Sequence, residues 1–443
     1  MKYLVITFDT EDYVHEYAAD GVLRDAELLT ELGIRGSFNV VGRMAKALVK
    51  WGRQDVIEAL KKHEINTHSL AHTYHPTINE YTDIADYDAA LAEFLRQETE
   101  CLEIIDEILD VRDIRAAIPP GNNLSYVAYY GYDKLGISAY GGNLLQDEQN
   151  GRPVYFCNLI NFPYHMSVDK RSHEQMLARF EEVCRQKQVA VVCHHPQMSY
   201  TPEYVDLLDF NRENVPEDRW KFYPQRPSEE TEQFYENFRY MIEKLKADPE
   251  FKIVTFGELV DIYNVPRKSI TLSVIPELRA QLLEYFFPVT SPDSYCISDI
   301  LLACRDLLSG KESHECGKVY GFLDTPYEIT SPVTLTADEV RLGAAAIGDG
   351  FLPTEIRIGD KVIGTADWLF AALDVLCGEN TVTLTPRSAQ IDLDQFPLLR
   401  DMDFSKEEVI WSYDFKDEYV SKRQRLQSWT IRLPAGTERK IFD

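Results

Sequence analysis

Short runs of hydrophobic residues alternate with amphipathic stretches along the first 265 residues of the chain. The runs at 4–8, 189–193 and 251–256 are rich in β-branched and aromatic residues and have the length of strands. Continuous hydrophobic runs of this kind are typical of parallel strands that are covered on both faces. Because helical stretches separate the runs, the pattern predicts βαβ units around a parallel sheet, and so an α/β fold.

The remaining elements of this part follow from periodicity and from residues that begin or end helices. Ser172 is an expected helix N-cap, with Gln175 completing a capping box, and Gly33 is expected just after a helix end. The stretch 198–227 is rich in Pro, Tyr and charge without a clear period, which predicts a long loop near a site. The other predicted strands are 36–42, 64–67, 113–119, 136–140 and 154–162, and the helices are 26–32, 51–61, 87–111, 127–135, 172–186, 230–246 and 257–263.

The pattern changes after a short linker at 265–268. A small hairpin with a Gly-Asp turn is predicted at 352–363. Helices are predicted at 298–308, 336–346 and 365–376. A chain of 443 residues is too long for one ordinary core, so we predict two domains. The first covers 1–265, and a smaller, mainly helical α+β domain covers 266–443.

The composition excludes some classes of binding partner and indicates a cellular compartment. The net charge of −27 argues against nucleic acid, whose binding needs clustered Lys and Arg, and against anionic membrane. The eight cysteines form no CxxC pair and lie mostly in hydrophobic runs, so they are expected as reduced core residues. The first hydrophobic run is too short for a signal peptide and no run approaches a membrane span, which predicts a cytoplasmic protein.

Three acidic residues follow the first predicted strand. Asp9, Glu11 and Asp12 come directly after the run that ends at Phe8. For any one of them, capping of the next helix is the simpler interpretation, but three acids exceed what a cap requires. The carboxyl end of a buried strand is where α/β barrels place catalytic groups.

Histidines occupy the ends of two further strands. His68 and His72 follow the strand at 64–67 and stand four residues apart, so on a helical turn they would share one face and hold a divalent metal ion. The alternative is a chance pair, since the chain has 10 histidines. His194 and His195 follow 189–193, and one of the two is expected to be an ordinary core residue because neighbours on a strand face opposite ways.

Several stretches together resemble the polysaccharide deacetylase (NodB-homology) family of carbohydrate esterases over about residues 1–265. They are, in chain order, 7–12, 29–42, 63–76 and 251–263. The third corresponds to the family's GHEIGNHTxxHP motif and is the most specific match. The resemblance implies a distorted (β/α)7-type barrel that uses a divalent metal to hydrolyse an N-acetyl group, less often an O-acetyl group, on an amino sugar.

The resemblance also implies roles for single residues. Asp9 matches the general base, and His195, which precedes a proline, matches the late acid histidine, with His194 as the fallback. A backbone N–H is expected to stabilise the oxyanion of the reaction. That N–H is expected near the turn formed by Pro120, Gly121 and Asn122.

The implied metal ligands are His68 and His72 together with one carboxylate. The family's first motif has two adjacent aspartates, but residue 10 is Thr10 here, so Glu11 and Asp12 both remain choices for the third ligand. One divalent ion is implied, zinc first, with manganese, cobalt or iron as alternatives. Two imidazole nitrogens and one carboxylate oxygen leave a fourth position open on zinc.

The chain departs from the family at the third motif, where an arginine normally precedes Pro-x-Gly. The stretch 116–121 has no arginine, and Arg115 lies farther back than the family spacing. That arginine would orient Asp9, so its loss weakens the case for catalysis. Three functions therefore stay open: a metal-dependent deacetylase of an N-acetylated sugar or glycan, a barrel that binds glycan without hydrolysing it, and a hydrolase of a non-sugar amide.

The second part of the chain weakly resembles the pseudomurein-binding repeat, a small cell-wall-binding module, in its helix–hairpin–helix order. A glycan-binding domain is one expectation for 266–443, and a structural or oligomerisation domain is the other. Trp368, Phe370 and Tyr320 are expected to lie in its core and not to form a sugar platform.

Overall fold

The chain forms two compact units. The computed structural model describes residues 1–121, 125–142, 151–162, 164–169, 171–391, 393, 396 and 411–437. Unit 1 comprises Met1–Pro153, Leu159–Asn264 and Asp401–Val420, and unit 2 comprises Val154–Asn158, Val265–Arg400 and Ser421–Asp443. Within the described ranges, every helix is too short or too polar to cross a membrane.

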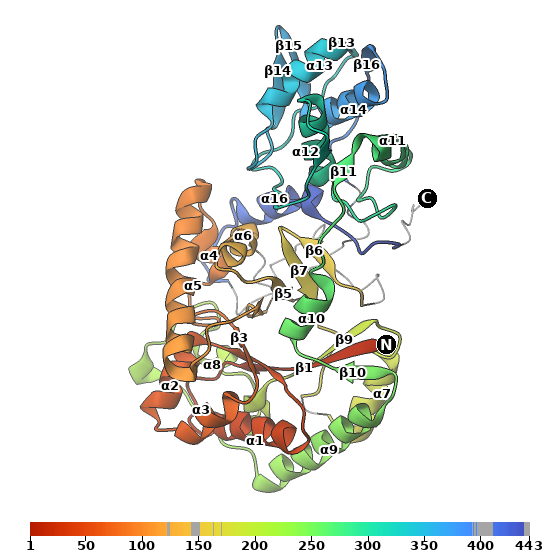
Figure 1. The fold of residues 1–443 in the computed structure, drawn as a ribbon. Coiled ribbons are helices and arrows are strands. Elements are labelled where there is room, and N and C mark those ends of the chain that lie inside the picture. The colour runs from red at the N-terminus through yellow and green to blue at the C-terminus, as the bar shows by residue number, and fades with distance from the viewer. Residues whose placement is uncertain are drawn as a thin grey trace. The chain divides into compact units, whose positions relative to one another are not determined.

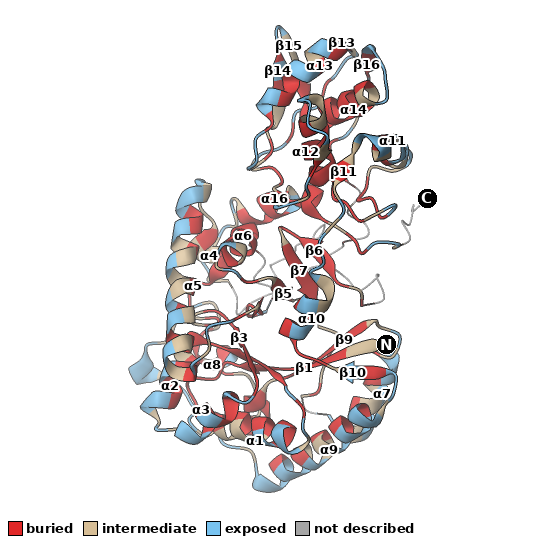
Figure 2. Cartoon of the chain, viewed as in Figure 1, coloured by how far each residue is buried: buried red, intermediate tan, exposed pale blue. Residues whose placement is uncertain are grey.

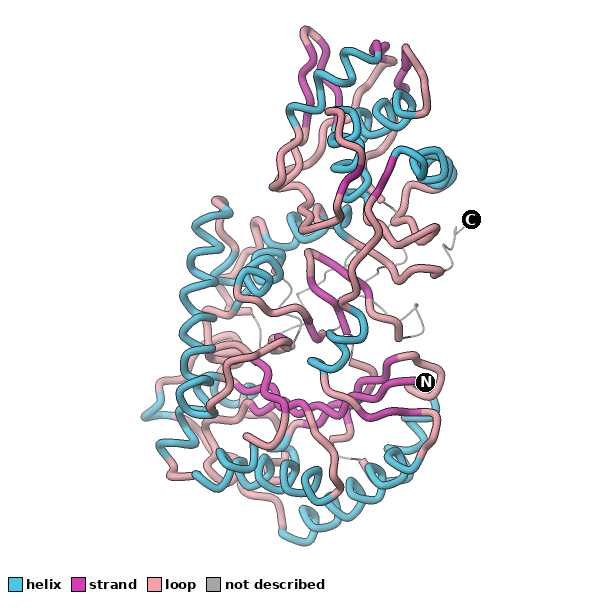
Figure 3. Tube along the Cα trace, viewed as in Figure 1, coloured by secondary structure: helices cyan, strands magenta, loops and turns pink. Residues whose placement is uncertain are grey.

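Unit 1 is built on a curled sheet with β1 (Lys2–Thr10) at its centre (Figures 1 and 3). The strands pair in the order β7-β5-β4-β3-β2-β1-β9-β8, and β10 pairs with the first residues of β1. These pairs are parallel, so the predicted barrel-like α/β fold is confirmed. The other strands are β2 (Ser37–Val40), β3 (Glu64–Thr67), β4 (Ala116–Ala117), β5 (Ala139–Gly141), β7 (Leu159–Phe162), β8 (Met166–Ser167), β9 (Val189–His194) and β10 (Phe251–Ile253).

The central strand β1 is shielded along its length by its neighbours. Leu4 and Phe8 are fully buried, as expected of a covered parallel strand. The register places Asp9 beside Asn39 of β2 and Phe8 beside His194 of β9. Because all these strands run the same way, the polar residues at their carboxyl ends gather at one edge of the sheet.

Amphipathic helices surround this sheet and turn their hydrophobic faces toward it (Figure 2). The predicted capping box is confirmed, because the Ser172 hydroxyl accepts the Gln175 N–H at 3.3 Å and the Gln175 carbonyl accepts the Ser172 N–H at 3.0 Å. The helices are α1 (Ala18–Glu31), α2 (Gly42–Lys50), α3 (Gln54–Leu60), α4 (Ile78–Thr82), α5 (Tyr87–Leu109), α6 (Tyr126–Lys134), α7 (His173–Val183), α8 (Asp206–Asp209), α9 (Ser228–Ala247) and α10 (Phe256–Tyr263).

Two predicted elements are shortened or divided at residues with positive φ. The helix predicted at 51–61 is only α3, because Gly52 adopts a φ of 71°, outside the right-handed helical region. The strand predicted at 154–162 is two strands, β6 (Val154–Phe156) and β7, because Cys157 and Asn158 have φ values of 44° and 73° and break the extended path.

Unit 2 packs its helices around α14, which is buried on nearly all sides. Trp368 and Phe370 of α14 lie in the core, as predicted, and the Trp368 indole donates to the Val340 carbonyl at 3.0 Å. Tyr320 is half-buried against the ring of Phe351. The elements are α11 (Ile275–Glu284), α12 (Ile297–Leu308), α13 (Ala337–Gly343) and α14 (Thr365–Leu376), with the strand pairs β11 (Ile270–Thr271) with β12 (Ser313–His314), β13 (Val333–Thr336) with β16 (Thr381–Leu384), and β14 (Glu355–Ile358) with β15 (Lys361–Gly364).

Candidate metal centre and catalytic site

Glu11, His68 and His72 form a buried group of three metal-ligating side chains. Glu11 Oε2 lies 3.2 Å from His68 Nε2 and 2.8 Å from His72 Nε2. In a tetrahedral zinc site with bonds of about 2.0–2.1 Å, ligand atoms lie about 3.3 Å apart, so the Glu11–His68 separation fits and the Glu11–His72 separation would widen by about 0.5 Å. The structure therefore brings together two of the predicted histidines and one of the two candidate carboxylates.

The two histidines do not meet through helical spacing. Residues 68–72 form a loop after β3, in which Ser69 and His72 adopt left-handed φ values of 67° and 56°. The Ser69 hydroxyl accepts the His72 N–H at 3.1 Å and closes the loop. The expectation of a helical turn was wrong, although the two rings face each other with centroids 5.1 Å apart.

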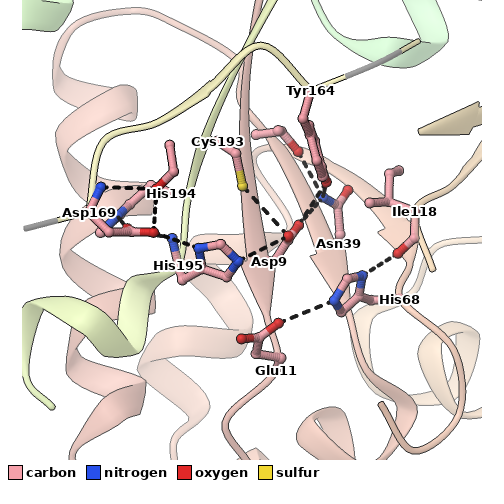
Figure 4. Close-up of polar contacts among 12 residues, drawn as sticks. Asp9, Glu11, Asn39, His68, Ile118, Tyr164, Asp169, Cys193, His194 and His195 are labelled. Atoms are coloured by element: carbon pink, nitrogen blue, oxygen red, sulfur yellow. Dashed lines mark hydrogen bonds and ion pairs between the residues drawn. The ribbon is translucent and has the colours of Figure 1, made fainter. Parts of the chain in front are cut away.

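Outer hydrogen bonds fix the orientation of both rings (Figure 4 shows that of His68). His68 Nδ1 donates to the backbone carbonyl of Ile118, and His72 Nδ1 lies 2.9 Å from Asp206 Oδ1. When Nδ1 alone carries a proton, the Nε2 atom of each ring has a lone pair that faces the Glu11 carboxylate and is available to a cation. A metal-ligating histidine usually has its second nitrogen held in this way, so the donor set fits a divalent ion such as zinc.

The charges around Glu11 favour its ionised form. Burial by itself raises the pKa of the Glu11 carboxyl, but the charges of His72 and His195 and hydrogen bonds from the two facing imidazoles outweigh it and hold the pKa well below its ordinary value. Burial lowers the pKa of His72, but the carboxylates of Asp206 and Glu11 outweigh that effect and raise it well above the ordinary value. The group thus carries an anionic oxygen that attracts a cation.

Asp12, the other candidate carboxylate, lies outside this group. Its Oδ1 accepts the N–H groups of Val14 and His15, and its Oδ2 lies 2.9 Å from His15 Nδ1. These contacts tie Asp12 into the loop that leads to α1. The geometry selects Glu11, and not Asp12, as the carboxylate beside the two histidines.

Asp9 and Glu11 are two residues apart, so on an extended chain their side chains point to the same side. Both carboxylate oxygens of Asp9 have contacts (Figure 4). Its Oδ1 accepts from Asn39 Nδ2 at 2.6 Å and from the Tyr164 hydroxyl at 3.0 Å. Its Oδ2 faces Cys193 Sγ at 3.6 Å and His195 Nε2 at 3.4 Å. Asn39 and Tyr164 were not identified from the sequence, and they orient the carboxylate.

His195 is paired with a carboxylate that the sequence analysis missed. Asp169, two residues after β8, has Oδ2 2.7 Å from His195 Nδ1 and accepts the His195 backbone N–H with Oδ1 at 3.1 Å. Burial lowers the pKa of His195, but the charges of Asp169 and Glu11 outweigh it and raise the pKa to about 10. His195 is therefore charged at neutral pH in this arrangement.

His194 points to the other face of β9, as neighbours on a strand do. Its Nδ1 contacts Asp169 at 2.5 Å, and its Nε2 lies 3.1 Å from the Ser199 hydroxyl and 3.6 Å from Asp25. Its ring stacks on Phe234. Of the two predicted acid histidines, only His195 reaches Asp9.

The remaining predicted positions are less informative. Pro120 is buried and Gly121 is exposed with a φ of 53°. Asn122 lies outside the described residues. Arg115 pairs with Asp261 of α10 at 2.7 Å, so it does not take the place of the family arginine beside Asp9.

No family model matches the chain, and no curated protein sequence matches it. The solved structures that resemble it over about 60% of its length include CE4-family pseudoenzymes and polysaccharide deacetylases. A variant, with restored activity, of a CE4 pseudoenzyme from Bacillus anthracis is 16% identical over 59% of this chain and 68% of that chain, with a TM-score of 0.35.

Two further structures are similar at the same level. A family 4 acetyl xylan esterase from Clostridium thermocellum, in complex with a cobalt ion, is 15% identical over 60% of this chain and 93% of that chain, with a TM-score of 0.33. A mutant of a peptidoglycan deacetylase from Bacillus subtilis is 15% identical over 63% of this chain and 96% of that chain, with a TM-score of 0.33. A likeness at these values carries no information on activity, substrate or metal.

Proposed function

We propose that the protein is a metal-dependent hydrolase that removes an acetyl group, first of all an N-acetyl group, from an amino sugar or glycan. The observation that carries the proposal is the convergence of Glu11, His68 and His72 on one point, with the outer nitrogen of each histidine held in place. A divalent ion at that point, zinc first, would activate water and polarise the acetyl carbonyl. The family resemblance of the motifs supports the choice of an acetylated sugar.

Asp9 is suited to take a proton from the attacking water. Asn39 and Tyr164 fix its Oδ1, and Oδ2, which faces Cys193 and His195, is the oxygen that would accept the proton. These two donors would take over the orienting role that an arginine has in the family, since Arg115 is paired elsewhere. A positioned general base is typically worth about 10² to 10⁴ in rate.

His195 is suited to donate a proton to the leaving nitrogen. It carries that proton at neutral pH, because Asp169 holds its Nδ1 at 2.7 Å, and its Nε2 faces Asp9. The leaving amine of a sugar needs a proton as the C–N bond breaks, and a fixed imidazolium supplies one. Asp9 and His195 therefore provide a base and an acid on neighbouring strands.

The test is release of acetate from a panel of N-acetylated sugars and oligosaccharides, with O-acetylated sugars beside them. The protein is first freed of metal and then loaded with one equivalent of zinc, manganese, cobalt or iron. We expect acetate and free amine in equal amounts, and neither from His68→Ala. Absence of acetate from every N-acetylated sugar with every metal would overturn the proposal.

A second function is favoured by one observation, the pairing of Arg115 with Asp261 away from the site. A barrel without the family arginine would bind an acetylated glycan without hydrolysing it. Saturable glycan binding by calorimetry, with no acetate released, would establish this function in place of the first.

A further inference from the structure

A second group of metal-ligating atoms lies beside the first. Asp9, Cys193 and His195 each direct one such atom to a common point, all within 4.8 Å of one another. Asp9 Oδ2 is 3.6 Å from Cys193 Sγ and 3.4 Å from His195 Nε2 (Figure 4). Asp9 and Cys193 are buried, and His195 is 20% exposed at its side chain.

The outer contacts of this second group follow the pattern of the first. His195 Nδ1 is held by Asp169 at 2.7 Å, which leaves Nε2 turned inward. Asp9 Oδ1 is held by Asn39 and Tyr164, which leaves Oδ2 turned inward. A carboxylate on the far nitrogen of a histidine is the usual outer support of a metal ligand.

The two separations that involve Asp9 Oδ2 fit a tetrahedral ion, and the third, between Cys193 and His195, is at most 4.8 Å. With a metal–sulfur bond of about 2.3 Å and metal–nitrogen and metal–oxygen bonds of about 2.0–2.1 Å, the sulfur and oxygen lie about 3.5 Å apart and the nitrogen and oxygen about 3.3 Å apart. Both agree with the observed separations to within 0.1 Å or so. A mixed S, N, O set favours zinc or cobalt over magnesium and calcium, which require oxygen ligands.

We propose that Asp9, Cys193 and His195 form a second zinc site, filled after the first, whose occupancy inhibits the enzyme. The inhibition rests on the proposed function, because the ion would hold both the base and the acid of that reaction. The binding itself does not depend on any activity.

The two sites differ in what binding must displace. A cysteine binds zinc as the thiolate, so the second site must lose the thiol proton of Cys193 when the metal binds. Binding forms one metal–sulfur bond and releases the thiol proton, together with the His195 Nε2 proton, to solvent. The first group contains no thiol and loses no such proton, so we expect the second site to be the weaker one.

Cobalt(II) titration of the metal-free, full-length protein tests the binding. A thiolate ligand gives cobalt a charge-transfer band in the near ultraviolet, and imidazole and carboxylate ligands do not. The first equivalent is expected to bind without this band, and the second is expected to produce it. Absence of the band with cobalt in excess would overturn the proposal.

Matched variants locate the sulfur. Cys193→Ser is expected to keep the first equivalent and lose the band, and Cys377→Ser, at an exposed cysteine of unit 2, is expected to keep both. Asp169→Asn leaves all three ligands in place and is expected to weaken the second site about 10- to 100-fold. Should Cys193→Ser not fold, loss of the band in His195→Gln serves instead. A band that persists in Cys193→Ser, or disappears in Cys377→Ser, would refute the assignment.

Zinc inhibition tests the consequence. The ratio of acetate release with one equivalent of zinc to that with excess zinc is measured within each protein. We expect at least about a tenfold ratio for the wild type and a ratio near one for Cys193→Ser. If the band appears but no protein releases acetate, the site stands and the proposed function fails. If acetate is released and zinc does not inhibit, the inhibitory role fails.

Discussion

The two units use buried acids in different ways. In unit 2, Asp299 and Asp367 each accept a backbone N–H from a residue three positions earlier, at the start of α12 and of α14. In unit 1, Glu11 contacts a histidine 57 residues away and a glutamine 186 residues away. Local partners cap a helix and stabilise it. Distant partners converge on one point and make a site, which is why the candidate metal groups of the described residues lie in unit 1.

Removing a buried histidine from each unit should separate the two uses most strongly. His68→Ala is expected to abolish metal binding and hydrolysis, because it removes one of three protein ligands. His314→Ala in unit 2 also removes a buried histidine, which is paired with Asp306 at 2.8 Å, and should keep the full metal content. Plasma emission on the dialysed proteins measures the metal. Undiminished metal in His68→Ala would contradict the assignment.

Neighbouring acids in unit 1 should also behave differently. Glu11→Gln is expected to weaken metal binding by more than about 100-fold, beyond the cost of losing an outer contact. Asp12→Asn should change it by less than about tenfold, because Asp12 contacts the loop and His15. Competition with a chelating dye gives both affinities. Equal losses of affinity in the two variants would mean that Asp12 supports the ion as much as Glu11 does.

An acid of unit 2 should affect stability and not metal. Asp299 is fully buried and paired with Arg267, whose side chain is 14% exposed, so Asp299→Ala leaves a buried cation without its partner. We expect a loss of about 3–5 kcal/mol in the free energy of unfolding of unit 2. Asp338→Ala, in an exposed pair with Arg341, is the control and should unfold like the wild type. Urea denaturation followed by tryptophan fluorescence measures both, with metal content unchanged.

The smallest expected effect is on the pH dependence of the stability of unit 1. Burial raises the pKa of Glu98 to about 7, against an ordinary value of 4.5, despite hydrogen bonds from Tyr132 and Thr67. The folded state then holds a proton that the unfolded state has lost, so stability is full below pH 4.5, falls as pH rises to about 7, and is level above. Glu98→Gln should flatten this fall, worth roughly 3 kcal/mol.

Chemical denaturation at pH 5 and pH 8 provides the measurement. Both proteins should lose stability between the two values, because burial also raises the pKa of Asp25 to about 7, and the variant should lose less by the share of Glu98. A variant with the same difference between the two pH values as the wild type would show that Glu98 is not the group responsible.

The sequence predicted the parts of the site that depend on local pattern. The strand at 64–67 has the bounds of β3, and the residues that follow it include the two histidines of the candidate metal group. The acids at the end of β1 and the histidines at the end of β9 were also placed at strand ends, because a hydrophobic run and its last residue are visible in the sequence alone.

The contacts between these parts could not be predicted. Asp9 is contacted by Asn39 and Tyr164, and His195 by Asp169. These contacts depend on the register of neighbouring strands and on residues far apart in the chain, which a local hydrophobic pattern does not encode. Asp206 lies on α8, inside the stretch predicted as a loop, since four residues are too few to show a helical period. A weak signal was available for Asp169, an acid just after a short hydrophobic stretch.

The two histidines of the candidate metal group differ in how easily a substitution can change the orientation of their rings. His68 donates to the main-chain oxygen of residue 118, which every amino acid possesses, so no side-chain exchange at that position deletes the acceptor. His72 relies on the carboxylate of Asp206. Changes in metal preference are therefore expected to arise at position 206, and variation at position 118 should be silent in this respect.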